Sequence, residues 1–246
     1  MSVAGRVSAQ PVTNVRAQER LRVRRLLGRG ALYVLAICIA ALFTGPFLWT
    51  VGSSLKSSVD IRSFPPTLFP STLHFENYIT VFQVVPFGQF LLNTIKVTAL
   101  AVTGQTVSAT FVAYGFARFR FPFRGFLFAL VLATLLLPRE VTWIPLFLLY
   151  KKLGWLDTLK PLIVPSFFGG GAFFIFLLRQ FFRSIPRELS DAAKVDGASE
   201  FRIYWQLIMP LSRPAITVVL IFTFLDNWNN FLEPLIILSS PDNFTV

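Results

Sequence analysis

The sequence has one cysteine and one histidine among its 246 residues, and only 14% of the residues are charged. One cysteine allows no disulfide within the chain, and Cys38 stands inside an apolar run, where cysteine is usually a small buried residue. His74, with no cysteine beside it, predicts no metal site. A soluble domain carries roughly 25% charged residues, so the low charge argues against a soluble protein.

Sequence patterns typical of enzymes and nucleic-acid-binding proteins are also missing. No G-x-x-x-x-G-K-[ST] stretch is present to bind phosphates, and one histidine supports no Ser/His/Asp set. The net charge of +11 comes mostly from short basic stretches beside apolar runs, without a nucleic-acid-binding motif. We expect no catalytic residue, no metal, no cofactor bound by this chain, and no nucleic-acid partner.

Long apolar runs dominate the sequence, 54% of which is hydrophobic. A run of about 20 apolar residues can cross the membrane as a helix, and these runs lack the alternation of a β-barrel strand. We therefore expect an all-α integral membrane protein with five visible spans. The predicted spans are Ala31–Val51, Phe90–Phe116, Phe126–Tyr150 (interrupted at 138–140), Pro161–Phe182 and Ala215–Leu238.

The distribution of lysine and arginine predicts the orientation. Sixteen of these bases lie in the N-terminal arm and in the second and fourth connections, whereas six lie on the other side. Because basic loops stay in the cytoplasm, we expect a cytoplasmic N-terminus. The arm, residues 1–30, either contacts anionic lipid or is a solvated tail. Residues 31–51 would be the first transmembrane helix, 52–86 an extracytoplasmic loop that docks a partner or lies on the membrane, and 87–246 the core.

One polar segment, SDAAKVDGASEFRIYWQLIMP at 190–210, interrupts the apolar sequence. Pro186 suits the first turn of a helix, and Gly197 predicts its end, because glycine accepts the left-handed conformation. A second short helix is expected from Ser199–Glu200 to about Ile208, with Pro210 and Pro214 ending it.

Four apolar residues of that second helix recur at i, i+3, i+4 and i+7, which predicts one apolar stripe. They are Phe201, Tyr204, Trp205 and Ile208. The segment is then either an element that another protein docks against or an amphipathic elbow resting on lipid.

The polar segment resembles the EAA signature of binding-protein-dependent ABC importer permeases. That signature is E-A-A, three residues, G, nine residues and I-x-L-P. Asp191 replaces the glutamate, Leu207 and Met209 replace the usual Ile and Leu, and the other positions match, namely Ala192, Ala193, Gly197 and Pro210. The stretches LFPSTLHFENY and FLDNWNNFLEPLI also resemble the carbohydrate subfamily, of the second maltose-permease subunit kind.

The resemblance implies a type I ABC importer fold, a place in a bacterial inner membrane and a role as permease subunit for a sugar or oligosaccharide. It implies that the loop 183–213 is a coupling element docked on an ATPase, with Asp191, Ala192, Ala193, Asp196, Gly197 and Pro210 as its site residues. Implied partners are a second permease subunit, two cytoplasmic ATPase subunits that use ATP and Mg²⁺, an extracytoplasmic solute-binding protein and membrane lipid. The alternative is a non-transporting membrane scaffold or receptor-like subunit.

Polar residues inside the apolar runs are candidates for a substrate pathway, because they are costly in lipid. Arg139 and Glu140 follow Pro138, which indicates a broken helix, a pathway-facing position or a shallow outer end. In the fifth run, carboxylates and amides at i, i+3 or i+4, and i+7 would share one helical face; these are Asp226, Asn229, Asn230 and Glu233. Such groups can bond sugar hydroxyls beside aromatic faces, or hold helices together.

Two further expectations concern glycine and the number of spans. Gly169–Gly171 are expected to be close-packing positions between helices rather than a hinge. The family usually has a sixth span after about Ser239, so we expect either a partial sequence or a last span that is supplied or dispensed with differently.

Overall fold

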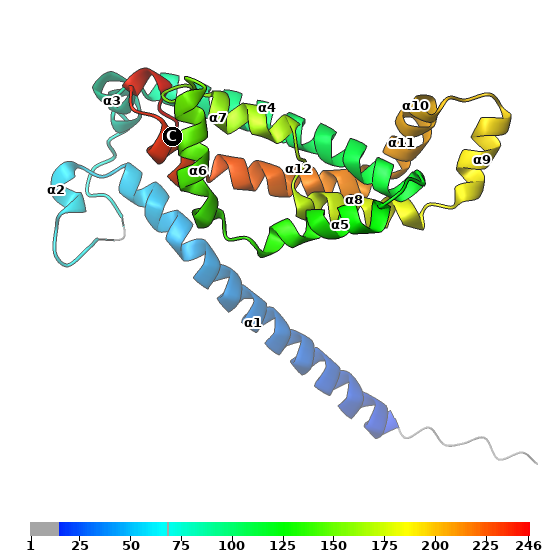
Figure 1. Ribbon diagram of the computed structural model, residues 1–246. Helices are drawn as coiled ribbons and strands as arrows, with labels where there is room; N and C mark the ends of the chain where they lie inside the picture. Colours follow the sequence, from blue (N-terminus) through cyan, green and yellow to red (C-terminus); the bar gives the residue numbers. More distant parts are fainter. Residues whose placement is uncertain (1–14, 68) are drawn as a thin grey trace, which may run out of the picture. The chain divides into compact units, whose positions relative to one another are not determined.

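A computed structural model describes residues 15–67 and 69–246, and every regular element among them is a helix (Figure 1). The side chains of residues 15–23 and 25 lie outside the description, so the expectation for the basic arm, residues 1–30, falls largely outside the described residues. The chain divides into two units, Met1–Gln83 and Val84–Val246. The boundary between loop and core predicted from the sequence lies three residues later, between residues 86 and 87. The all-α membrane fold is confirmed.

The first unit contains the long helix α1 (Val15–Ser54), followed by α2 (Ser58–Ile61) and α3 (Asn77–Val84). The part of α1 from Leu26 to Ser54 is long and apolar enough to cross a membrane, and none of its most apolar window is buried in the protein. Such uniformly exposed apolar side chains suit contact with lipid on all sides. The Asn77 amide donates to the carbonyls of Ser54 and Lys56, both at 3.0 Å, and so fixes the chain after α1.

The second unit is built around the long helix α4 (Phe87–Arg118), against which several of its other helices pack (Figure 1). The elements that follow are α5 (Arg124–Ala133), η1 (Thr134–Leu136), α6 (Arg139–Lys152), α7 (Lys160–Ile163), η2 (Val164–Phe167), α8 (Ala172–Ser184), α9 (Arg187–Val195) and α10 (Glu200–Ile203). The chain then forms a π-helix, η3 (Tyr204–Ile208), and continues with α11 (Met209–Leu211), α12 (Arg213–Trp228), α13 (Leu232–Ile237) and η4 (Pro241–Asn243).

Small residues let α8 and α12 approach α4 closely. Ala109, Ala113 and Ala117 recur every four residues of α4, and all are buried. Because residues four apart share one helical face, they form a smooth stripe. The fully buried Leu178 of α8 and Val219 of α12 belong to the same core cluster as this stripe. In lipid, the hydrophobic effect does not drive helices together, because lipid tails are as apolar as the side chains, so helices associate through close packing over small residues.

Three segments of the described chain are long and apolar enough to span a membrane, and up to five are if each of two bent pairs counts as one. The prediction of one continuous fifth helix is wrong, whereas the predicted interruption of the third run is present. The third is broken after Leu136, where Arg124–Leu136 and Arg139–Lys152 meet at 99°, so the broken-helix alternative is confirmed. In the fifth, α12 ends at Trp228 and α13 begins at Leu232, because Asn229 adopts a non-helical cap conformation.

Candidate functional site

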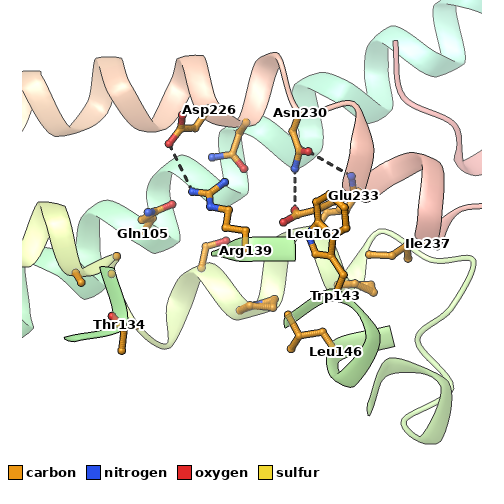
Figure 2. A pocket seen from close by; sticks show the side chains of 18 of the residues that line it. Gln105, Thr134, Arg139, Trp143, Leu146, Leu162, Asp226, Asn230, Glu233 and Ile237 are labelled. Atoms are coloured by element: carbon orange, nitrogen blue, oxygen red, sulfur yellow. Dashed lines mark hydrogen bonds and ion pairs between the residues drawn. The ribbon is translucent and has the colours of Figure 1, made fainter. Parts of the chain in front are cut away.

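A cavity of about 540 Å³ opens between α4, α6, the α7–η2 segment, α12 and α13. Polar side chains from α4, α6, α12 and α13 surround it, as Figure 2 shows. Four of the six expected pathway residues line it, namely Arg139, Asp226, Asn230 and Glu233. The other two, Glu140 and Asn229, do not. The structure thus brings together residues that lie almost one hundred positions apart in the sequence.

Arg139 enters the cavity because of the break in the third span. Pro138 is the N-cap of α6 in an extended conformation, and Arg139 is the first residue of the new helix. Its guanidinium extends toward α12 and reaches Asp226, with 4.0 Å between Nη2 and Oδ2 (Figure 2). Both side chains are more than half exposed, so this ion pair is solvated and open to an incoming ligand.

Asn230, which lies between α12 and α13, is hydrogen-bonded to Glu233 in the first turn of α13. The Asn230 amide donates to Glu233 Oε2 at 2.8 Å, and the Glu233 backbone N–H donates to Asn230 Oδ1 at 3.4 Å (Figure 2). Asn229 instead donates its amide to the Leu225 carbonyl of its own helix, at 2.8 Å. The expectation that 226, 229 or 230, and 233 share one continuous helical face is wrong, because α12 ends at Trp228.

Aromatic and amide groups missing from the expected set complete the lining. Trp143 and Tyr150 come from α6, Gln105 from α4 and Asn227 from α12. The Tyr150 ring also stacks on Trp155 at 6.2 Å between centroids. Gln105 is a polar residue inside an apolar span, and that property alone could have marked it. The apolar spacing of α6 gives no comparable signal for Trp143 or Tyr150.

The glycine run of the fourth span forms another wall of the cavity. Gly170 has a φ of +60°, and a Cβ there would lie 2.5 Å from the Cα and N atoms of Ala109. Close packing is therefore confirmed for Gly170. A Cβ on Gly169 would meet nothing within 4 Å, so the expectation does not hold for that residue. The run also interrupts the span between η2 and α8.

Chemically, the lining offers one guanidinium, two carboxylates, three carboxamides and aromatic rings. These groups can accept and donate several hydrogen bonds while covering an apolar surface. No cluster of three or more His, Cys, Asp or Glu side chains suited to a metal occurs in the described part of the chain. Such a lining can form hydrogen bonds with a polar molecule.

The polar segment forms the opposite end of the second unit, where α9 lies past the end of α4 while α10 and η3 lie against the last turns of α4 (Figure 1). Asp191, Ala192 and Asp196 are exposed, whereas Ala193 is partly buried and packs against the core cluster. Gly197 takes a φ of +80° directly after α9. The predicted break between two short helices is therefore confirmed, and one face of α9 is open.

Three details of the two short helices differ from their predictions, and two of them concern the second helix. Ser199 is its N-cap, accepting from the Arg202 N–H at 3.3 Å, but the π-helix η3 rotates the residues that follow. Tyr204 and Ile208 are buried while Phe201 and Trp205 are exposed, so the single apolar stripe is wrong. Pro210 does not end the helix, because it lies in the first turn of α11. Pro186 precedes α9 as its N-cap instead of lying in its first turn.

The fold and the site define a class of protein: a helical membrane protein with a polar cavity among its spans and an exposed helical segment at one end. The model of the family described as "binding-protein-dependent transport system inner membrane component" matches residues 105–246. The chain belongs to this family. It is an inner-membrane permease subunit of an ABC importer and not an enzyme, and the scaffold alternative is not favoured.

Individual relatives agree with this assignment. The chain is 34% identical over 214 residues to the diacetylchitobiose uptake system permease protein NgcG of Streptomyces coelicolor, covering 87% of this chain and 70% of that protein. It is 34% identical over 211 residues to the arabinooligosaccharides transport system permease protein AraQ of Halalkalibacterium halodurans, covering 85% and 75%.

A solved structure extends the similarity to the fold. It is the crystal structure of a bacterial ABC transporter involved in the import of the acidic polysaccharide alginate, with a TM-score of 0.78 and 25% identity. The match covers 90% of this chain and 78% of that chain. The expected type of fold is thereby confirmed.

Proposed function

We propose that this permease subunit passes a neutral sugar or oligosaccharide through the cavity described above. The observation that carries the proposal is the lining itself, in which Arg139, Asp226, Asn230 and Glu233 meet beside Trp143 and Tyr150. Carboxylates and amides bond hydroxyl groups, and aromatic faces cover the C–H side of a sugar ring. Two carboxylates against one guanidinium leave a net negative lining, which disfavours anionic solutes. The sugar-uptake names of NgcG and AraQ also support the proposal.

The exposed polar segment is the proposed docking site for the ATPase. Asp191, Ala192 and Asp196 face outward on or directly after α9, and Gly197 turns the chain back toward the core. Ala193, which packs against the core, would then support the docking surface from its core side, and the exposed Pro210 would belong to the surface itself. An ATPase pair using ATP and Mg²⁺ would bind here, a second permease subunit would complete the pathway, and a solute-binding protein would deliver the sugar outside. The N-terminus would lie in the cytoplasm.

Docking is tested by purifying the complex through this chain. We expect a soluble ATPase to co-purify with the wild-type chain and to be lost with Ala192→Arg, because a long charged side chain on the open face of α9 blocks close approach. Ala192→Ser keeps the surface small and should retain the ATPase. Retention by the arginine variant would contradict the proposed docking site.

The cavity is tested by uptake of radiolabelled solutes into proteoliposomes that hold the complete transporter. We expect transport of a neutral sugar from a panel that also contains glycerol phosphate and amino acids. Asn230→Ala should lower uptake at low solute concentration about five- to tenfold, the effect of removing a hydrogen bond to a ligand. Asn229→Ala is the matched control, because its amide bonds only its own helix. Equal effects of the two substitutions would exclude the cavity as the pathway.

A further inference from the structure

The polar segment is bonded to α4 at two places, one helical turn apart. The Tyr114 hydroxyl donates to Glu200 Oε2 at 3.0 Å, and the Tyr204 hydroxyl donates to Thr110 Oγ1 at 2.8 Å. Thr110 and Tyr114 are four residues apart on α4, and their partners Tyr204 and Glu200 are four residues apart on the polar segment, in the opposite chain direction. Because four residues make about one turn of helix, the two bonds fix how α10 and η3 lie along α4.

We call the Tyr114–Glu200 bond the outer bond and the Tyr204–Thr110 bond the inner bond. The outer bond differs from the inner one because its Glu200 carboxylate also contacts α9. Lys194, in the last turn of α9, approaches Glu200 Oε1 with its Nζ at 2.5 Å. Glu200 lies in the first turn of α10, across the turn at Gly197. One carboxylate therefore joins three helices: Lys194 of α9 through one oxygen, and Tyr114 of α4 through the other. We call Lys194, Glu200 and Tyr114 the Glu200 bridge.

The chemistry of the bridge requires a carboxylate of this length. Glutamine has one side-chain oxygen and cannot accept on both sides in the same way. Aspartate is one methylene shorter and would lose reach to one partner. A bond between ionised groups is also about twice as strong as a neutral one.

The two ends of the bridge differ in burial. Tyr114 is 5% exposed and is fixed by aromatic neighbours, with centroids at 5.5 Å for Phe119, 6.4 Å for Phe182 and 5.1 Å for Tyr204. The Lys194 and Glu200 side chains are 50% and 41% exposed. The bridge thus connects a surface helix to a buried, rigid position on the central span, which also lines the cavity through Gln105.

We propose that Glu200 is a positioning residue that transmits displacement of α9 to α4, and thereby links the docked ATPase to the cavity. This inference rests on the proposed function, since it assumes that an ATPase docks on α9. The inner bond between Tyr204 and Thr110 holds η3 against α4 but makes no contact with α9. It serves packing alone. Removing the Glu200 bridge should leave the ATPase bound and weaken the response of α4.

The response of α4 can be measured without knowing the solute. Cys38 is the one cysteine of the chain, so Cys38→Ser gives a background for Gln105→Cys, which reports on the cavity wall. The complete transporter with its co-purified ATPase is placed in proteoliposomes. Maleimide labelling of residue 105 is then compared without nucleotide and after trapping with ATP and vanadate. We expect the labelling rate to change on trapping in this background.

Three substitutions break the bridge and one matched substitution leaves it intact. Tyr114→Phe, Glu200→Gln and Lys194→Met should each reduce the trapping-induced change in labelling at least about threefold, with the ATPase still bound. Tyr204→Phe removes the same kind of hydroxyl from the same helix pair and should lower thermal stability while keeping the full change. Lys194 lies at the surface, so its substitution does not endanger folding.

The outcomes separate this inference from the proposed function. A full change in all three bridge variants would overturn the role of Glu200 and leave ATPase docking intact. An equal loss in Tyr204→Phe would also overturn it, because the effect would then follow from loosened packing. A background that does not respond to trapping, or that holds no ATPase, would contradict the proposed function and the inference with it.

Discussion

Gly170 has no side chain at the point where the fourth span passes against α4. A Cβ there would lie 2.5 Å from backbone atoms of Ala109, and the φ of +60° is unfavourable for other residues. We expect Gly170→Ala to lower the free energy of unfolding by about 1–3 kcal/mol, because backbone atoms cannot move aside cheaply. Thermal unfolding in detergent measures this. Gly169→Ala, where a Cβ meets nothing within 4 Å, should change it by less than about 0.5 kcal/mol.

At this scale, the sequence indicates which residue types matter better than where they point. Arg139, Asp226, Asn230 and Glu233 were predictable, because charges and amides are rare in apolar spans and rarely lie there without a role. Choosing between Asn229 and Asn230 was not possible. The choice depends on α12 ending at Trp228, and no proline or glycine marks that end. Trp143 and Tyr150 face the cavity only because the break before Arg139 reorients α6.

The turn between α9 and α10 depends on one backbone conformation. Gly197 has a φ of +80°, and a Cβ there would meet no neighbour within 4 Å. Alanine would therefore introduce backbone strain of about 1–2 kcal/mol without a steric clash. We expect Gly197→Ala to shift α9 relative to α10 and to reduce co-purification of the ATPase severalfold. Gly115→Ala, within α4 and equally open, is the control and should retain it. Unchanged co-purification in both variants would show that the turn tolerates other conformations.

Elements were predictable where local signals decide them. Ser199 and Gly197 mark the ends of the two short helices, because a hydroxyl caps a helix start and glycine accepts a positive φ. The π-helix η3 has no such signal. Its wide turn places Tyr204 and Ile208 in the core and turns Trp205 outward. Tyr204 then packs against α4, where its ring stacks on that of Phe111 with 4.7 Å between the centroids.

Asp157 ties together segments of the second unit that are far apart in sequence. Its carboxylate accepts from the backbone N–H groups of Ser239 at 2.9 Å and Ser240 at 2.8 Å, and from the Ser240 hydroxyl at 2.5 Å. These hydrogen bonds, the Ser240 hydroxyl foremost, hold the pKa of Asp157 well below its ordinary value of 3.8. The stabilisation is thus complete above the unfolded pKa and is lost as the pH falls through the lower, folded pKa.

We expect Asp157→Asn to lower the unfolding temperature by a constant amount between about pH 5 and pH 8, and the gap to the wild-type chain to narrow below about pH 4. Thermal unfolding in detergent across this range measures it. Asp242→Asn is the control, because the Asp242 carboxylate takes no part in these hydrogen bonds and only its backbone carbonyl is used. A gap that widens on acidification would contradict the assigned sign.

At the scale of the whole molecule, apolar run length predicted a helical membrane protein, because only helices and closed barrels satisfy the backbone in lipid. Run length did not predict the bends. The third run reads as one span, yet Arg124–Leu136 and Arg139–Lys152 meet at 99°. Pro138 permits such a break, but its size follows from packing around the cavity, which no local pattern encodes.

The unbroken length of α4 has a mechanical consequence. At about 1.5 Å per residue, its 32 residues measure roughly 48 Å, while the hydrocarbon layer is only about 30 Å thick. The helix therefore extends beyond the hydrocarbon core of the bilayer or is strongly tilted within it. Either way, α4 is one continuous helix that lines the cavity through Gln105 and contacts the polar segment through Thr110 and Tyr114. A displacement of those C-terminal turns would therefore reach the cavity wall without crossing a break in the helix.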